Sequence, residues 1–469
     1  MDTCVIKSHE QSPAPDEVVL MGSFVDASVD TKKKKREYAS VKDLLFINYL
    51  PYVMLAISRS GYWLLTPLFL REEFGSSDSF IGVCSGFAHA TNFLVSFLLG
   101  KAVARFGYQR CLQMSCFAFA TTYFLGAQPQ VQGTFLFSTC LMGMSEPMHF
   151  LAHHAFMCKY VPVDRRGKAM SAAGGTFRMG SIVGPLYVAG FVPLVGLRNS
   201  FYLLIPTTFI VPFLLFTCMY PRDLIAPMKK RKDLGKSIEL TDLTIVQAGA
   251  ATEPSKEEEL SFIRTGPLQI AYDFRFLLCR VGFFIFLLNI IREGMQLMIP
   301  LTGMANKLTT MEIATCTSAQ FICGSSMFPF SGLIMDNCGR RVNATTAVVI
   351  ISSGFMVMSL TDDFTGLLFA GILVGTGNGL ASGLQMTLGS DTAPNDNRRS
   401  PYLGIYNMVG TFGKIVGPLI AGGICTLFGV RKGALVLFGI CLFAAVYIVF
   451  GMKETLVKKK AGEAAEASI

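Results

Sequence analysis

Charged residues are scarce in this sequence. They make up 16% of its 469 residues, whereas a soluble domain averages about 25%. Apolar residues supply 51% of the chain, and the mean hydropathy is +0.48. This balance excludes an ordinary soluble globular domain and predicts a polytopic membrane protein embedded in the lipid bilayer.

Motifs of catalysis and of metal binding are also missing. The 13 cysteines are scattered without the spacing of metal ligands, and small apolar packing side chains explain them. The sequence has no nucleophile–base spacing and no phosphate-binding loop. These absences argue against an enzyme, a metal site or a cofactor. Because the first 40 residues are polar, no cleavable signal peptide is expected.

Long apolar runs are abundant. A helix that spans a bilayer needs about 20 mostly apolar residues, and this criterion predicts twelve such helices. They are 43–70, 80–100, 110–126, 133–157, 169–192, 199–219, 276–303, 312–334, 343–361, 365–388, 403–427 and 431–452. We therefore predict an all-α membrane protein with twelve transmembrane helices.

Lys and Arg are concentrated in alternate connections between these runs. Since basic residues favour the cytosolic side of a membrane, their distribution predicts that both termini are cytosolic. The net charge of +9 follows from this bias, so no nucleic-acid partner is inferred. The sequence does not distinguish the plasma membrane from an endomembrane.

The chain repeats itself at an offset of 232 or 233 residues. The matching positions are Arg59/Arg292, Gly100/Gly332, Gly107/Gly339 and the "IVGPL" stretches at 182–186 and 415–419. Several separate matches at one offset indicate two homologous halves. We predict two pseudo-symmetric six-helix bundles, 43–219 and 276–452, with a cytosolic linker at 220–275 and cytosolic tails at 1–42 and 453–469.

Two stretches carry a family resemblance. "GLIMDNCGRR" (332–341) resembles the signature loop of the major facilitator superfamily, and "GKAVARFGYQR" (100–110) is its first-half copy, with Ala104 where the family has Asp. The resemblance implies alternating access to a small-molecule substrate by a monomer, with the loops latching the halves in one state. The implied latch residues are Gly100, Arg105, Gly107, Gly332, Asp336, Gly339, Arg340 and Arg341.

Two further stretches resemble the drug/proton antiporter branch of this superfamily. They are "GSIVGPLYVAG" (180–190) and "GSDTAPNDNRR" (389–399). The Gly-Pro pairs of the repeated stretches are read as helix-packing motifs, because small residues let helices approach closely and proline bends them. These pairs are Gly184, Pro185, Gly417 and Pro418.

Arg59 and Arg292 lie inside apolar runs, at matching depths of the first and seventh predicted helices. A central Arg costs about 2.5–3.5 kcal/mol on insertion scales, so each needs a wet cavity or a counter-charge. Paired guanidinium groups suit a carboxylate or a phosphate. The pair also resembles the anion-binding arginines of glycerol phosphate antiporters and of vesicular glutamate and sialic acid carriers. We therefore expect the two arginines to face each other across a cavity and to bind an anion; the alternative is a structural role.

Glu146 is the predicted proton-coupling acid. His149 and His153 follow it at i+3 and i+7 on the same helical face, and His154 lies elsewhere around the helix. A carboxyl group in a poorly hydrated cavity exchanges protons, and histidines titrate near neutral pH. Glu146 acting only as a fixed counter-ion to Arg59 remains open. Glu293 is a second acid candidate, better suited to a clamp.

Other polar residues of these helices are candidate substrate ligands. Asn289 and Gln296 share the face of Arg292, Trp63 lies one turn after Arg59, and Asn378 is the repeat partner of Glu146. The sequence thus predicts a secondary transporter of a small, anionic, proton-coupled solute. A drug/proton antiporter that exports amphiphilic compounds, and a receptor or scaffold with a transporter fold, remain alternatives.

Overall fold

The computed structural model describes residues 49–128, 131–161, 163–210, 267–394, 396, 398–452 and 454. Within these residues the chain forms helices and the turns between them, without a strand. The predicted tails and most of the predicted linker lie outside the described residues. The end of that linker, Pro267–Asp273, forms a short helix, α11.

The helices follow the predicted spans closely. The first half contains α3 (Leu50–Phe74), α4 (Asp78–Phe106), α5 (Tyr108–Ala127), α6 (Gln132–Tyr160), α7 (Val163–Ser200) and η2 (Pro206–Ile210). The second half contains α11, α12 (Arg275–Leu277), η5 (Leu278–Gly282), α13 (Phe283–Ala305), α14 (Thr310–Asn337), α15 (Arg340–Leu360), α16 (Phe364–Leu380), α17 (Leu384–Thr392), α18 (Arg399–Phe428) and α19 (Val430–Gly451).

Seven of the described helical segments are long and apolar enough to cross a membrane. They are Leu50–Phe74, Asp78–Gly100, Lys168–Ser200, Arg340–Leu360, Phe364–Thr392, Pro401–Phe428 and Val430–Gly451. The multi-pass architecture is therefore confirmed, whereas the count of twelve is not. The sixth predicted span, 199–219, lies partly outside the described residues, and the tenth is broken between α16 and α17.

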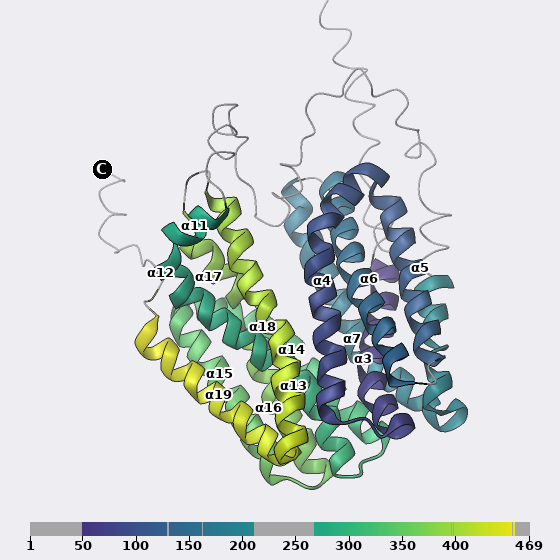
Figure 1. Ribbon diagram of the computed structural model, residues 1–469. Coiled ribbons are helices and arrows are strands. Elements are labelled where there is room, and N and C mark those ends of the chain that lie inside the picture. The colour runs from purple at the N-terminus through teal and green to yellow at the C-terminus, as the bar shows by residue number, and fades with distance from the viewer. Residues whose placement is uncertain are drawn as a thin grey trace, which may run out of the picture.

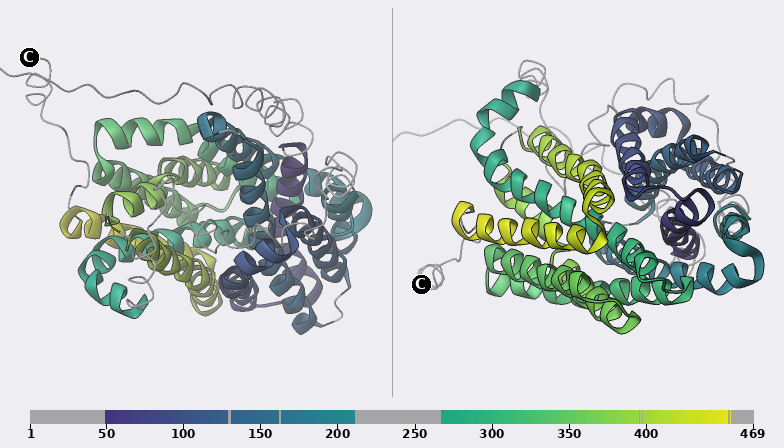
Figure 2. Two further views of the ribbon diagram at one scale, coloured as in Figure 1. Left: turned by 90° about the horizontal axis from the view of Figure 1, so that it is seen from above. Right: turned by 60° about the horizontal axis from the view of Figure 1, so that its bottom comes forward.

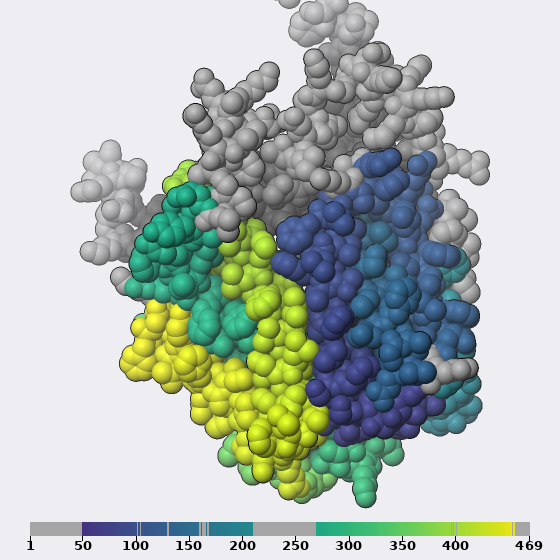
Figure 3. Space-filling model, in the orientation of Figure 1, coloured from purple at the N-terminus to yellow at the C-terminus, as the bar shows by residue number. Residues whose placement is uncertain are grey.

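The two halves form separate helix bundles that lie side by side (Figures 1 and 2). Two pairs of helices join them: α4 packs on α18, and α7 packs on α14. Because α4 corresponds to α14 and α7 to α18 in the repeat, these two contacts are equivalent by pseudo-symmetry. Figure 3 shows α18 against α4 on the front of the molecule.

The close approaches of α4 to α18 lie where α4 begins and α18 ends. A Cβ atom added to Gly82 would lie 2.3 Å from the Pro418 carbonyl oxygen, and one added to Gly422 would lie 2.3 Å from that of Asp78. The Ser79 amide also donates to Thr426 Oγ1 at 2.6 Å. Glycine is required here because the two backbones touch. The halves are thus closed against each other at this end, and the bundles diverge toward the other end (Figure 1).

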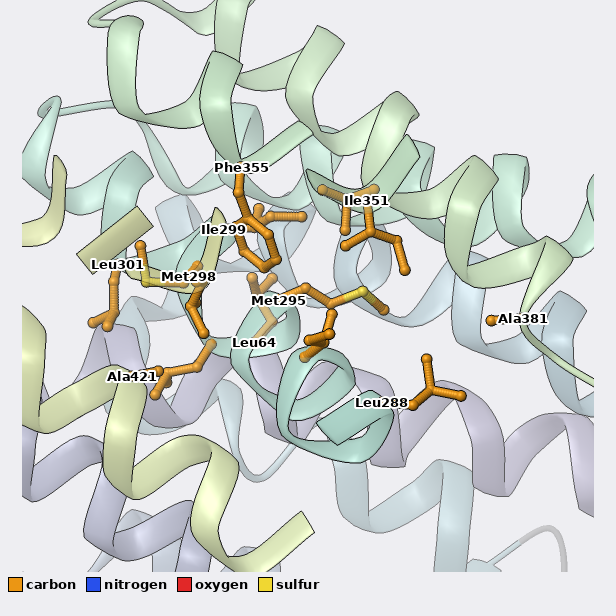
Figure 4. Packing of buried hydrophobic residues seen from close by; sticks show 14 of the residues in the cluster. Leu64, Leu288, Met295, Met298, Ile299, Leu301, Ile351, Phe355, Ala381 and Ala421 are labelled. Carbon is orange, nitrogen blue, oxygen red and sulfur yellow. The ribbon is translucent and has the colours of Figure 1, made fainter. Parts of the chain in front are cut away.

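A shared apolar core supports this closed end. It contains Leu64 of α3 together with Met295, Met298 and Ile299 of α13 and Phe355 of α15, all almost fully buried. Figure 4 shows these side chains packed around α13. One continuous core across both halves fixes the position of α3 relative to α13, the two helices that carry the intramembrane arginines.

Four glycines reproduce the internal repeat in the backbone. Gly107 and Gly339 have φ of 81° and 105°, and Gly196 and Gly429 have φ of 79° and 86°. Their ψ angles are all between 153° and 164°, a region that only glycine adopts without strain. The pairs are separated by 232 and 233 residues. The same turn therefore enters the equivalent helix in each half.

Candidate functional site

A cleft lies between the halves, with about 740 Å³ of empty space including the part open to solvent. Its walls come from α3 and α4 of the first half and from α13, α14 and α18 of the second. The lining residues are Arg59, Ser60, Trp63, Leu64, Pro67, Ser85, His89, Glu293, Gln296, Leu297, Pro300, Thr317, Gln320, Phe321 and Pro418. Four of the residues predicted to bind substrate or protons, Arg59, Trp63, Glu293 and Gln296, are therefore in one cleft.

Arg59 forms an ion pair with Glu146. Its Nε donates to Glu146 Oε1, and the guanidinium carbon lies 5.8 Å from the centroid of the Phe177 ring. The Glu146 side chain is 8% exposed and that of Arg59 21%. Because Arg59 also lines the cleft, a molecule bound there meets this ion pair directly.

Arg292 makes the equivalent contact in the second half. Its Nε donates to Asn378 Oδ1 at 3.1 Å, and its Nη2 donates to the Ala381 carbonyl oxygen at 2.7 Å. Ala381 ends α16, so its carbonyl is available at the break between α16 and α17. The predicted arrangement of two arginines facing each other across the cavity is not what the structure contains, since Arg292 is directed to α16 and is not among the cleft-lining residues.

His89 and Glu293 join the two halves across the cleft. The distance from His89 Nε2 to Glu293 Oε2 is 3.2 Å, and both side chains are nearly buried. The Trp63 ring is stacked on the His89 ring, with 5.9 Å between centroids and 6° between planes. Lys414 and Arg59 also interact electrostatically with Glu293. The sequence indicated a clamp at Glu293 but did not identify His89 as its partner.

The three histidines of α6 lie within the first bundle. His149 Nδ1 is 3.0 Å from Ser115 Oγ, and the His153 ring is stacked on Tyr52 at 4.3 Å and 5°. His154 Nδ1 is 2.8 Å from the Phe150 carbonyl oxygen. None of the three is among the cleft-lining residues, so the structure does not bring them together with the site around Arg59.

The remaining candidates hold other parts of the second bundle. Asn289 is 1% exposed and donates to the Ile285 carbonyl at 2.9 Å and to Gln385 Oε1 at 3.3 Å. Gln385 in turn donates to Asn407 at 3.2 Å. Asn289 thus belongs to a buried amide network, and Asn378 holds Arg292 rather than facing the cleft.

The second-half signature loop makes its described contacts within its own half. Arg340 donates to Asp391 at 3.0 Å, to the Met335 carbonyl at 2.7 Å and to Asp336 at 3.4 Å. The Glu454 carboxylate accepts from the amides of Arg340 and Arg341.

The side chain of Asp336 is 76% exposed, which leaves it available to the solvent. In the first-half copy, Arg105 lies 5.7 Å from the centroid of the Phe106 ring. A Cβ atom on Gly100, Gly107 or Gly332 would meet nothing within 4 Å.

The Gly-Pro pairs pack helices together within each half. A Cβ atom on Gly184 would lie 2.3 Å from the Ile57 carbonyl oxygen of α3, and one on Gly417 would lie 2.9 Å from that of Ile290 in α13. Pro185 and Pro418 both lie inside their helices. These contacts set α7 against α3 and α18 against α13, the helices that carry Arg59 and Arg292.

Several solved transporters share this fold. The nucleoside transporter NupG is 12% identical and superposes with a TM-score of 0.65 over 88% of this chain and 100% of its own. A bacterial homologue of the human lysosomal transporter Spinster, solved inward-facing and unoccupied, gives a TM-score of 0.66 at 12% identity over 87% and 96%. The human organic anion transporter MFSD10 gives 0.55 at 15% identity over 87% and 99%. At these identities the likeness shows the fold alone.

Sequence comparison identifies the family. A stretch of 125 residues is 27% identical to the vesicular acetylcholine transporter of Drosophila melanogaster; it is 27% of this chain and 22% of that protein. The model of the Major Facilitator Superfamily matches residues 49–398 and 281–469. With the two-bundle fold, the internal repeat and a cleft between the halves, these matches establish that the chain belongs to the Major Facilitator Superfamily.

Proposed function

We propose that this chain is a secondary transporter of a small organic anion and that transport is coupled to protons. Membership of the superfamily supports transport of a small solute across a membrane. The anionic character and the proton coupling rest on the charges around the cleft. The observation that carries the proposal is the arginine pair, of which one member has a carboxylate partner and the other has only neutral partners.

The charge balance at mid-depth of the described helices favours an anion. The charged side chains there are Arg59, Glu146, Arg178, Arg292, Glu293 and Lys414. Four are cations and two are carboxylates, so the balance is positive even with neutral histidines. A positive cleft with low-dielectric walls attracts anions and disfavours cations. Arg59 presents its guanidinium to the cleft, and Arg292 adds a positive charge that Asn378 does not compensate.

Glu146 links the anion to a proton. A carboxylate or phosphate that binds Arg59 competes with the Glu146 carboxylate for the same guanidinium. Protonation of Glu146 removes this competition, so the proton and the anion bind cooperatively. Cooperative binding of both from one side is the requirement for symport, and release of both on the other side restores the ion pair.

The closed end of the molecule gives the direction of access. With the orientation predicted from Lys and Arg, α4 and α18 are closed against each other on the side opposite the cytosol. The cleft is then open to the cytosol. Movement of α4 and α7 away from α18 and α14 opens the other side, which is the rocking motion expected of a carrier with inverted or paired repeats.

Flux measurements in liposomes test this proposal. The full chain is reconstituted and given an imposed proton gradient, with labelled carboxylates, phosphate esters and sugar acids as probes. We expect gradient-driven accumulation of at least one anion, its loss in Arg59→Gln, and exchange without accumulation in Glu146→Gln. Arg198→Gln, which removes an exposed ion pair with Glu73, is the matched control and retains transport.

A cation exporter is the second candidate. It is favoured by the partial match to a vesicular acetylcholine transporter and by the presence of Glu293 in the cleft wall. In the same liposomes, accumulation of amphiphilic cations in exchange for protons, with no anion flux, supports this candidate and contradicts the first. Absence of flux for every probe instead supports a receptor or scaffold.

A further inference from the structure

Two N–H groups in the cleft wall have no hydrogen-bond acceptor. Trp63 Nε1 and Gln320 Nε2 are both buried and without a partner among the described residues. Gln320 is 3% exposed, and both residues line the cleft. Buried donors are almost always paired, because an unpaired one bears its full desolvation cost. Two unpaired donors at one cleft therefore indicate that a ligand supplies the acceptor.

The two donors come from opposite halves and are held in place by packing. Trp63 of α3 is stacked on His89, which in turn contacts Glu293. Gln320 of α14 is in tight contact with α16, since a Cβ atom added to Gly375 would lie 2.3 Å from the Gln320 carbonyl oxygen. An acceptor bound between them contacts both halves of the transporter.

The surroundings define the rest of the ligand. Leu64, Pro67, Leu297, Pro300 and Phe321 give the same cleft an apolar surface. An apolar wall with two donors suits a carbon skeleton that carries a carbonyl oxygen, which accepts two hydrogen bonds and donates none.

We propose that the substrate is an oxo-substituted organic anion. Its anionic group binds Arg59, and a separate neutral carbonyl oxygen accepts hydrogen bonds from Gln320 Nε2 and Trp63 Nε1. The inference rests on the proposed function for the anionic group. The carbonyl subsite selects among anions, because a site built to donate hydrogen bonds rejects an analogue that lacks the acceptor.

Four small probes test the two parts of this proposal separately. Levulinate and isocaproate have the same charge and chain length, and the ketone oxygen of the first is replaced by a methyl group in the second. Levulinamide and isocaproamide are their neutral counterparts. The full chain is purified in lipid nanodiscs, and binding is followed by the emission of its single tryptophan, Trp63.

We expect the ketone probe to bind about tenfold more tightly than its methyl partner, in the acid pair and in the amide pair. Gln320→Leu removes this preference and leaves isocaproate affinity unchanged. Gln269→Leu, at an exposed position of α11, keeps it. Thermal melting without ligand confirms that Gln320→Leu is folded, and Gln320→Met is the second variant with the same expected loss.

Equal binding of the ketone and methyl probes, a preference that survives in both Gln320 variants, or binding of no probe overturns the carbonyl subsite. The anionic part is read from the comparison of levulinate with levulinamide. Equal affinity for acid and amide contradicts the proposed anion transport even where the ketone preference is present. A preference for the acid that is lost in Arg59→Gln supports both parts together.

Discussion

The two halves hold their intramembrane arginines in the same way but with different chemistry. Arg59 of α3 contacts Glu146 of α6, and Arg292 of α13 contacts Asn378 of α16. Both contacts connect equivalent helices, and Glu146 and Asn378 are separated by the repeat offset of 232. The duplication has therefore kept the anchor and changed its charge. The first half has a partner that takes up a proton, whereas the second has one that does not.

The cleft wall repeats this division. Among its residues, Leu64/Leu297, Pro67/Pro300 and Ser85/Thr317 are repeat partners with similar side chains. The repeat partners Ser60/Glu293, Trp63/Gln296 and His89/Phe321 differ in charge or polarity. The similar pairs form a symmetric apolar surface that suits a rocking motion. The different pairs supply the groups that distinguish a substrate from other small molecules.

The largest effect is expected from removing each arginine in turn. Arg59→Gln leaves the buried Glu146 carboxylate without its partner, and breaking a buried ion pair costs about 3–5 kcal/mol of the free energy of unfolding. Arg292→Gln leaves only neutral acceptors, each worth about 1–3 kcal/mol when unpaired. Thermal and denaturant unfolding in detergent micelles measure this difference.

The double variant Arg59→Gln/Glu146→Gln separates stability from transport. It contains no unpaired charge, so we expect most of the lost stability to return while anion flux stays absent. Equal destabilisation by Arg59→Gln and Arg292→Gln contradicts the asymmetry between the halves.

Exchanging the partners of the arginines is expected to have the next largest effect. Glu146→Asn gives the first half the amide of the second, so anion exchange should become independent of an imposed proton gradient. Asn378→Asp compensates Arg292 and should weaken anion binding about tenfold by lowering the positive potential of the cleft. Flux with and without a proton gradient checks the first variant, and ligand titration checks the second.

A smaller effect is expected at the contact between the halves. His89→Phe copies the repeat partner Phe321 and leaves Glu293 without its hydrogen bond, which costs about 1–3 kcal/mol. Because the contact exists only while α4 is close to α13, the variant should shift the population toward the state in which the ends of α4 and α18 separate. Distances between spin labels at Ser79 and Thr426 measure this shift, and an unchanged distance distribution argues against a role in closure.

The sequence predicted the two-bundle fold because hydropathy and the repeat are local patterns that survive in the folded chain. It also placed Arg59 and Glu146 on the site, since helical spacing puts both at mid-depth. It did not predict that Arg292 turns toward α16, because the available Ala381 carbonyl arises from a break between α16 and α17. It did not pair His89 with Glu293 either, because this contact depends on how α4 packs against the opposite half.

The smallest effect concerns the glycine turns that the two halves share. Gly107 and Gly429 both have positive φ, and a Cβ atom on either would meet nothing within 4 Å. Alanine should therefore cost only the strain of the backbone conformation, about 1–3 kcal/mol at each site. Gly423→Ala is the matched control: its Cβ atom also meets nothing, but the site is helical, so alanine should stabilise it by about 0.5–1 kcal/mol. Equal losses at Gly107 and Gly429 in thermal melting show that the turns are energetically equivalent, whereas a loss at only one of them means that the repeat is retained in shape but not in stability.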